Sequence, residues 1–164
     1  MQTSLSVVGL MSSPLIAVSP GTRVDEVLGL AHAKRIHHFP IVAEDRLVGF
    51  VCTCDLLSAD GQDLVASRAW PHPVTVSPAC PATDAARLML LHGVGSLVVA
   101  DHRGLHGILT CEDLRRASSE LETLLEDARC VICRAGQHLR PGPGGVPVCA
   151  HCKRQTPGLL GGSS

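Results

Sequence analysis

Aromatic residues are scarce in this sequence. Its 164 residues include two Phe, one Trp and no Tyr. Surfaces that bind single-stranded nucleic acid stack bases on aromatic side chains, so this composition argues against such a surface. No apolar run approaches the roughly 18 residues of a membrane span, and the first residues lack the basic and apolar regions of a signal peptide. We therefore expect a cytoplasmic protein with no membrane segment.

Acidic residues are also missing from the last part of the chain. Residues 1–128 carry 9 Lys and Arg against 15 Asp and Glu, whereas residues 129–164 carry five basic residues and no acid. The cysteines divide at the same place, and the two C-x2-C pairs of the basic segment are Cys130, Cys133, Cys149 and Cys152. Hydrophobic residues make up 45% of the chain, which excludes general disorder. The steps in charge and cysteine content indicate two parts with different roles.

A repeat with an offset of 58 residues runs through the acidic part. It aligns Pro14–Leu57 with His72–Arg115 without a gap. The identities include Val18-Ser19-Pro20 with Val76-Ser77-Pro78, Gly49 with Gly107, and Asp55-Leu56 with Asp113-Leu114. One copy alone would bury too little surface to be stable, so two copies should pack together.

Both copies show the same order of elements. The first has β-rich segments at Leu15–Val18, Phe39–Val42 and Leu47–Cys52, a helical pattern at Thr22–Ala33 and a second helix start near Asp55. The second has β-rich segments at Val74–Val76, Leu97–Ala100 and Leu105–Thr110, a helical pattern at Thr83–Leu91 and a second helix start near Asp113. The predicted fold class is α+β, with two pseudosymmetric β-α-β-β-α repeats packed as one module.

The repeat resembles the cystathionine-β-synthase (CBS) domain, whose tandem pair is called a Bateman module. The resemblance rests on this strand order and on a Gly-apolar-apolar-Thr-x-x-Asp motif, present as Gly107–Asp113 in the second copy and as Gly49–Asp55 in the first. It covers roughly residues 7–117. It implies an adenosine-containing ligand (AMP, ADP, ATP or S-adenosylmethionine) and a disc-like homodimer formed through the helices.

The resemblance also implies where a ligand would bind. Thr110 and Asp113 would hold the ribose, and the residues expected to flank the base are Pro14, Ile16, Ile36 and His37. His37 and His38 occupy the position that often contacts phosphate. The mirror cleft would use Asp55, with His72, Val74, Val94 and Gly95. Because Cys52 stands where the motif has Thr, and a thiol is a weak hydrogen-bond partner, we expect at most one occupied site, centred on Asp113.

A simpler interpretation applies to the same residues. Asp55 and Asp113 are typical helix-capping residues, and a CBS pair can serve only as a dimerisation platform. A cap accounts for the two Asp residues but, on the sequence, not for Thr110. Cys54, Cys80 and Cys111 are interpreted as small buried or half-buried residues without a redox role, because they form no C-x-x-C pair.

The C-terminal cysteines predict a metal site. Fifteen residues separate the two C-x2-C pairs, a spacing typical of four-thiolate sites in zinc ribbons. The segment has too few large apolar residues to build its own core, so metal binding would supply folding free energy. Zn2+ is the first choice, with iron in a rubredoxin-like site as the alternative; two disulfides or unligated thiols are the non-metal interpretations. Four protein ligands leave no open position, so the site should be structural.

These assignments give the predicted domain boundaries. They are repeat 1 at 7–58, repeat 2 at 65–117, a connecting helix at 118–128 with a capping pair Ser119 and Glu122, a zinc-ribbon-like element at 129–156 and a disordered tail at 157–164.

Three functions are compatible with the sequence. The first is a regulatory protein that senses an adenosyl ligand and responds through the basic metal element, which could contact a protein partner. The second is a nucleic-acid or transcription-apparatus adaptor, although five basic charges without aromatics would bind only weakly. The third is a rubredoxin-like iron protein. We do not expect an enzyme, because the sequence offers no nucleophile–base pair, no phosphate-binding P-loop and no open metal site.

Overall fold

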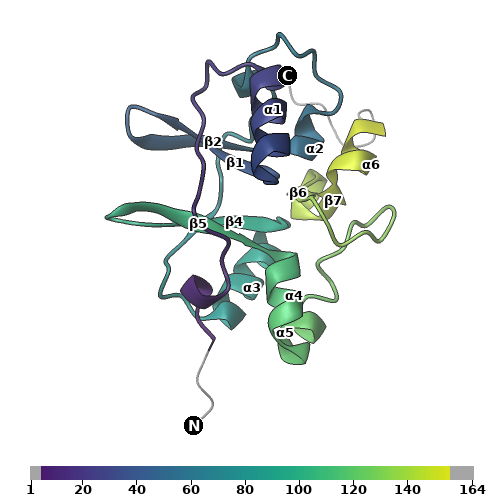
Figure 1. The fold of residues 1–164 in the computed structure, drawn as a ribbon. Coiled ribbons are helices and arrows are strands. Elements are labelled where there is room, and N and C mark those ends of the chain that lie inside the picture. The colour runs from purple at the N-terminus through teal and green to yellow at the C-terminus, as the bar shows by residue number, and fades with distance from the viewer. Residues whose placement is uncertain (1–4, 156–164) are drawn as a thin grey trace. The chain divides into compact units, whose positions relative to one another are not determined.

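The computed structural model describes residues 5–155. The tail predicted at 157–164 lies outside these residues. The described chain divides into two units: residues 15–73 form one, and residues 5–14 together with 74–155 form the other (Figure 1). Among the described residues, none of the helices has the length and apolar character that crossing a bilayer requires.

The 15–73 unit contains the first repeat. Its elements are α1 (Val24–Lys34), β1 (His38–Ala43), β2 (Arg46–Cys52), α2 (Thr53–Leu56) and the 3-10 helix η2 (Val65–Arg68). β1 and β2 pair as an antiparallel hairpin. Val24, Val27 and Ala31 lie one helical turn apart on α1 and are buried against the hairpin residues Phe39 and Ile41. The predicted helix, the two strands after it and the second helix are therefore confirmed here.

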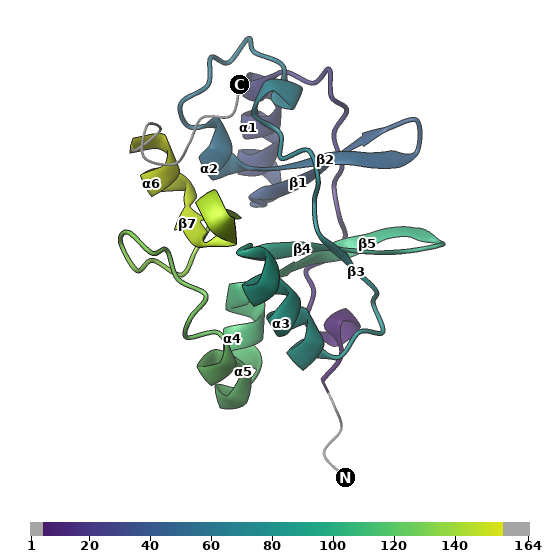
Figure 2. The ribbon, with the colours of Figure 1, turned by 180° about the vertical axis from the view of Figure 1, so that it is seen from behind.

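The other unit contains the second repeat. Its elements are the 3-10 helix η1 (Val7–Gly9), β3 (Thr75–Val76), α3 (Ala82–His92), β4 (Ser96–Asp101), β5 (Gly104–Thr110), α4 (Cys111–Ala117) and α5 (Ser119–Leu124). β4 pairs with β5 antiparallel and with β3 in parallel (Figure 2). The helices α3 and α4 lie on one side of this sheet (Figure 1).

The 58-residue offset holds in structural detail. α1 and α3, β1 and β4, and β2 and β5 have boundaries that differ by 58 residues. The hairpin bulges fall at the equivalent places, Ile41/Val42 and Val99/Ala100. Both long helices end on a left-handed residue, Arg35 with φ 54° and Gly93 with φ 63°. The two copies therefore share one chain path, as the sequence predicts.

One predicted strand is not formed. Leu15–Val18 contributes only an isolated bridge from Val18 to Ile41, whereas the equivalent β3 is a strand. In the second repeat the Val98 N–H donates to Val74 O at 3.0 Å. The equivalent residue in the first repeat is Pro40, which has no N–H, so that ladder bond cannot form.

The connecting helix predicted at 118–128 is observed only over α5 (Ser119–Leu124), and it has a different cap. α5 begins at Ser119, but its N-cap is Ser118, whose hydroxyl accepts from the Leu121 N–H at 3.1 Å. The predicted pair of Ser119 with Glu122 is wrong because Ser118 has the extended backbone that an N-cap requires, with ψ 151°.

A small cysteine-containing element follows α5. It consists of a turn at Cys130–Cys133, an antiparallel hairpin of β6 (Leu139–Pro141) and β7 (Pro147–Cys149) with the 3-10 helix η3 (Pro143–Gly145) between them, and α6 (Ala150–Gln155). We call residues 129–155 the cysteine element. Five of its buried residues join the core of the second repeat, and they are Cys130, Leu139, Val148, Cys149 and Cys152.

Candidate functional site

Thr110 and Asp113 form a closed hydrogen-bonded pair at the junction of β5 and α4. Asp113 Oδ2 accepts from the Thr110 backbone N–H at 2.8 Å and from the Thr110 hydroxyl at 2.7 Å. In return, the Asp113 N–H donates to Thr110 Oγ1 at 3.2 Å. This is a capping box with Thr110 as the N-cap of α4.

The cap thus accounts for Thr110 as well as Asp113. The interpretation that a cap explains only the carboxylates is wrong, because Thr110 itself supplies the capping hydroxyl. Capping fixes both side chains in one place even without a ligand, which preorganises a hydroxyl and a carboxylate side by side.

Arg116 is a polar residue of this site that the sequence reasoning missed. Its Nη2 donates to Asp113 Oδ1 at 3.0 Å, and its side chain is 68% exposed whereas that of Asp113 is 11% exposed. The i, i+3 spacing from Asp113 on the predicted helix was the available signal. Since a carboxylate has about four acceptor sites, the three contacts described leave capacity for a further donor.

The first repeat has the same box with a thiol in place of the hydroxyl. The Cys52 N–H donates to Asp55 Oδ2 at 2.8 Å, and the Cys52 side chain accepts from the Asp55 N–H. This matches the expected inequality of the two motifs, because sulfur is the weaker acceptor.

The other predicted ligand contacts are distributed over both units. Pro14 lies in the unit of Thr110 and Asp113 and is exposed. In the 15–73 unit, Ile16 and Ile36 are half-buried, and the exposed His37 has Nδ1 3.4 Å from Thr53 Oγ1. His38 stacks on Phe50, with ring centroids 5.8 Å apart. The predicted ligand contacts therefore come from both units, with Pro14 in one and Ile16, Ile36, His37 and His38 in the other.

The four C-terminal cysteines gather in one cluster. The sulfur atoms of Cys130, Cys133, Cys149 and Cys152 all lie within 4.8 Å of one another. The Sγ atoms of Cys133 and Cys149 are 3.6 Å apart, and the Cys152 N–H points to Cys149 Sγ at 3.4 Å. Four sulfurs bound tetrahedrally at about 2.3 Å from a zinc ion would be about 3.8 Å apart. The thiols therefore fit a tetrahedral metal.

Protonation within the cluster is uneven. Desolvation acts to raise the pKa of Cys130, but backbone hydrogen bonds from Cys149, Cys133 and Ile132 outweigh it and lower that pKa to about 6. Burial and hydrogen bonds from the neighbouring thiols raise the pKa of Cys152 to about 12. The groups share protons as a set, and binding a metal would release the remaining ones.

The cysteine element docks on the second repeat where two glycines leave room. The Gly95 N–H donates to Leu139 O at 3.1 Å. A Cβ at Gly93 would lie 2.5 Å from Gly145 O, and one at Gly95 would lie 3.0 Å from Leu139 N. The equivalent residues in the first repeat are Arg35 and His37, whose side chains would fill this space. The glycines therefore make the second repeat the one that can accept the element.

Arg115 ties α4 to the same element. Its guanidinium donates to Gly136 O and to Ala128 O, each at 3.0 Å, and to Leu125 O at 3.5 Å. Gly136 lies between the two cysteine pairs and Ala128 precedes Cys130. One short helix therefore carries the Thr110–Asp113 cap at its start and the anchor of the cysteine element two residues later.

Replacing Arg115 with Met should weaken the attachment of α4 to Gly136 of the cysteine element and to the chain before it. The substitution keeps most of the apolar stem and removes the donors to three carbonyls. Hydrogen bonds to charged groups contribute about 1.5–3 kcal/mol each, so we expect a loss of about 2 kcal/mol or more in the free energy of unfolding. Arg116→Met is the matched control, because Arg116 is exposed and a surface change costs about 0.5 kcal/mol or less. Urea unfolding of both variants measures this, and equal losses would contradict the anchoring role.

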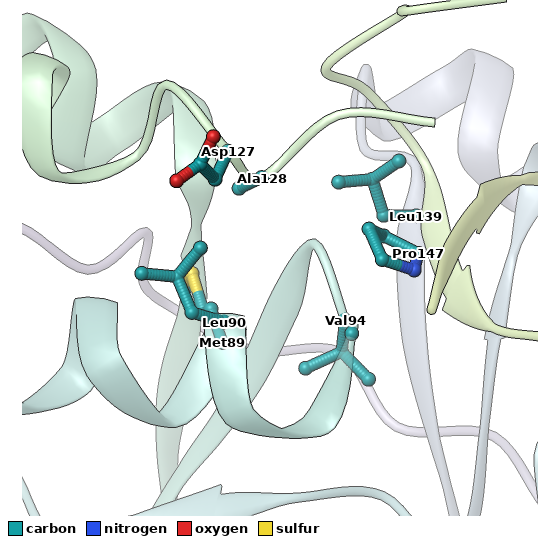
Figure 3. A pocket seen from close by; sticks show the side chains of 8 residues that line it. Met89, Leu90, Val94, Asp127, Ala128, Leu139 and Pro147 are labelled. Carbon is teal, nitrogen blue, oxygen red and sulfur yellow. The ribbon is translucent and has the colours of Figure 1, made fainter. Parts of the chain in front are cut away.

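An apolar cavity of about 310 Å³ lies beside this anchor (Figure 3). It is lined by α3, the chain after α5 and the cysteine element, and the residues are Met89, Leu90, Gly93, Val94, Asp127, Ala128, Leu139 and Pro147. The cavity therefore lies where the cysteine element meets α3.

Comparisons with known proteins agree with this arrangement. The sequence model of the CBS domain matches residues 7–61 and 65–120. A CBS domain-containing protein of Dictyostelium discoideum is 33% identical over 123 residues, covering 64% of this chain and 85% of that protein.

Solved structures of CBS domain pairs also resemble the fold. The CBS domain pair of protein MJ0100, in complex with 5′-methylthioadenosine and S-adenosyl-L-methionine, is 25% identical with a TM-score of 0.63, covering 69% of this chain and 94% of that one. CBSX2 in complex with AMP is 31% identical with a TM-score of 0.59, covering 71% of this chain and 98% of that one. With both repeats matched and their shared chain path observed, this chain belongs to the CBS domain family and carries two CBS domains in tandem.

Proposed function

We propose that this chain is a regulatory protein that binds one adenosyl ligand at the Thr110–Asp113 motif and transmits its occupancy to a metal-stabilised cysteine element. The observation that carries the proposal is the position of α4. This helix begins at the proposed ribose anchor, and Arg115 on the same helix holds Gly136 and Ala128 of the adjoining segment.

The chemistry of the motif supports ribose as the group that is bound. Asp113 Oδ1 accepts from Arg116 and retains acceptor capacity, and the exposed Arg116 side chain can turn away to free more. A cis-diol offers two adjacent donors to such a carboxylate. The similar CBS pairs of MJ0100 and CBSX2 were solved with adenosine compounds, which supports the same ligand class here.

A single ligand per chain is the stoichiometry we propose. The first-repeat motif offers the Cys52 thiol in place of the Thr110 hydroxyl. In addition, the Leu139 backbone packs against Gly95, which is one of the residues that the mirror cleft would use. The residues proposed to contact the base are Pro14, Ile16, Ile36 and His37, and His38 is proposed to lie near the ligand. Asp55 belongs to the first-repeat motif, which is proposed to bind no ligand.

The metal is proposed to be Zn2+, held by Cys130, Cys133, Cys149 and Cys152. The clustered thiols and the backbone N–H groups aimed at them suit a thiolate centre. With four thiolates the ion would be structural and would contribute to folding, with no open position for a substrate. Iron at the same cysteines is the alternative that metal analysis distinguishes.

Ligand binding should raise the thermal stability of the zinc-loaded protein. A ligand at a hundredfold excess over its Kd stabilises the folded state by about 2.7 kcal/mol, which for a chain of this size is a midpoint shift of about 5 °C or more. A thermal-shift panel of AMP, ADP, ATP and S-adenosylmethionine tests this, with IMP, which differs from AMP in the base alone, as the matched control. The absence of any shift at millimolar concentration would overturn the sensing role.

The nucleic-acid adaptor is the less favoured function. Arg140, one of the basic residues counted toward a phosphate-binding tail, is 4% exposed and donates to Leu139 O. That leaves fewer charges available to phosphate. The predicted homodimer stays a prediction; Leu57 and Leu91, which are 70% and 74% exposed, are available for helix-mediated association.

A further inference from the structure

Two cysteines of the first repeat lie in direct contact. Cys54 Sγ is 2.9 Å from Cys52 Sγ. Cys52 is fully buried at the end of β2, whereas Cys54 is half-buried in α2. The distance must shorten by only about 0.9 Å to reach the length of a disulfide bond. We infer that Cys52 and Cys54 form a reversible intramolecular disulfide, so that the first repeat carries a redox-sensitive modification site.

The position of the pair gives the disulfide a structural consequence. The Cys52 side chain accepts from the Asp55 N–H and thereby caps α2. In the oxidised form this sulfur is bonded to Cys54, which pulls it out of the cap. The oxidised form then keeps only the backbone half of the box, in which the Cys52 N–H donates to Asp55 Oδ2, so the four-residue helix α2 loses one of its two capping bonds. The equivalent residues of the second repeat are Thr110 and Glu112, so that copy keeps its cap under oxidation.

The chemistry requires a low-molecular-weight disulfide such as glutathione disulfide as the oxidant. The Cys54 thiolate, at the more accessible position, attacks one sulfur of that disulfide, forming a mixed disulfide and releasing one glutathione thiolate. The Cys52 thiolate then attacks Cys54 Sγ, which forms the Cys52–Cys54 bond and releases the second glutathione thiolate. The two thiol protons pass to the two released thiolates, and two electrons leave the protein.

The experiment is a peptide mass measurement on the full-length, zinc-loaded protein. The protein is incubated with glutathione disulfide, quenched in acid, unfolded in the presence of N-ethylmaleimide and digested with trypsin. Cleavage after Arg46 and Arg68 gives a peptide, residues 47–68, whose cysteines are Cys52 and Cys54 alone. Residues 69–87 and 104–115 give separate peptides with the single cysteines Cys80 and Cys111.

Cys80 and Cys111 serve as internal controls. Burial raises the pKa of Cys111 to about 11, so this thiol should react slowly. Cys80 is half-buried like Cys54, and its thiol contacts Pro81 O at 3.5 Å in place of another thiol. Burial and the neighbouring Asp84 carboxylate raise the pKa of Cys80, so Cys80 shows how far a half-buried thiol with a raised pKa reacts when it has no resolving partner.

We expect the doubly alkylated 47–68 peptide to fall at least about tenfold at an oxidant level that leaves most of Cys80 alkylated. In its place an unalkylated 47–68 peptide should appear, with a mass two hydrogen atoms below that of the reduced, unalkylated peptide, and dithiothreitol should reverse the change. Cys54→Ser and Cys52→Thr, which installs the residue of the second repeat, should each abolish the lighter peptide. A 47–68 peptide alkylated to the same extent as Cys80, or one that stops at the glutathione adduct, would overturn the inference.

Discussion

Replacing Cys149 with Ser is expected to strip the metal and to destabilise the second CBS repeat together with the cysteine element. Cys149 is buried and belongs to the core that contains Met89, Val94 and Leu121. Structural zinc contributes about 10–16 kcal/mol of apparent binding free energy in isolated zinc-finger peptides. Loss of only 3 kcal/mol here would lower the melting midpoint by about 6–12 °C. Metal analysis and calorimetric melting measure the two effects.

Cys80→Ser is the matched control for this substitution. Cys80 lies in the same unit, outside the cluster, and should leave the metal content at about one ion per chain. Lowering the pH should have the same effect as Cys149→Ser, because protons compete with the metal for thiolates. A colourless zinc-loaded protein supports the structural site, whereas a visible absorption band identifies iron. Full metal content in the Cys149 variant, or disulfides between the four cysteines, would contradict the four-thiolate site.

Asp113→Asn should reduce the affinity for the adenosyl ligand by at least about tenfold. The carboxylate provides charged acceptors, and each hydrogen bond to a charged group is worth about 1.5–3 kcal/mol. Asn preserves the shape of the side chain and one oxygen for the Thr110 cap, so most of the folding stability should remain. Isothermal titration calorimetry with AMP gives the affinity and the stoichiometry.

The control for Asp113→Asn comes from the other repeat. Asp55→Asn changes the equivalent residue of the thiol-capped motif and should leave the affinity within about twofold. Comparable losses in both variants would mean that the two motifs are equivalent, and an unaffected Asp113 variant would move the ligand away from this helix.

Local patterns were sufficient for the repeat and for the metal cluster. The offset of 58 residues predicts the elements of one copy from those of the other, because both encode the same periodicity and the same capping box. The spacing of Cys130 to Cys152 brings four sulfurs together because each C-x2-C turn places two thiols on one side. The sequence also contains the reason why no strand forms at Leu15–Val18. Pro40 occupies the position of Val98, whose N–H donates a ladder bond in the second repeat, and proline has no N–H.

Contacts between distant segments could not be predicted. Nothing near Gly93 and Gly95 in the sequence indicates that Leu139 will pack on them, and Arg115 carries no signal that distinguishes it from the exposed Arg116. The C-x-C spacing of Cys52 and Cys54 does not by itself indicate a contact; the bend from β2 into α2 brings these two residues together. The packing of Leu139 on the glycines and the contacts of Arg115 depend on tertiary structure, which local propensity does not encode.

Amide chemical shifts give the most direct test of the central claim, that an adenosyl ligand binds at the start of α4. The zinc-loaded, isotope-labelled protein is titrated with AMP, and each backbone amide is followed. We predict saturable shifts that are largest at Thr110, Cys111 and Asp113, with smaller ones at Ala128 and Gly136 transmitted by Arg115. Shifts absent at millimolar AMP, or confined to residues 15–73, would contradict the account.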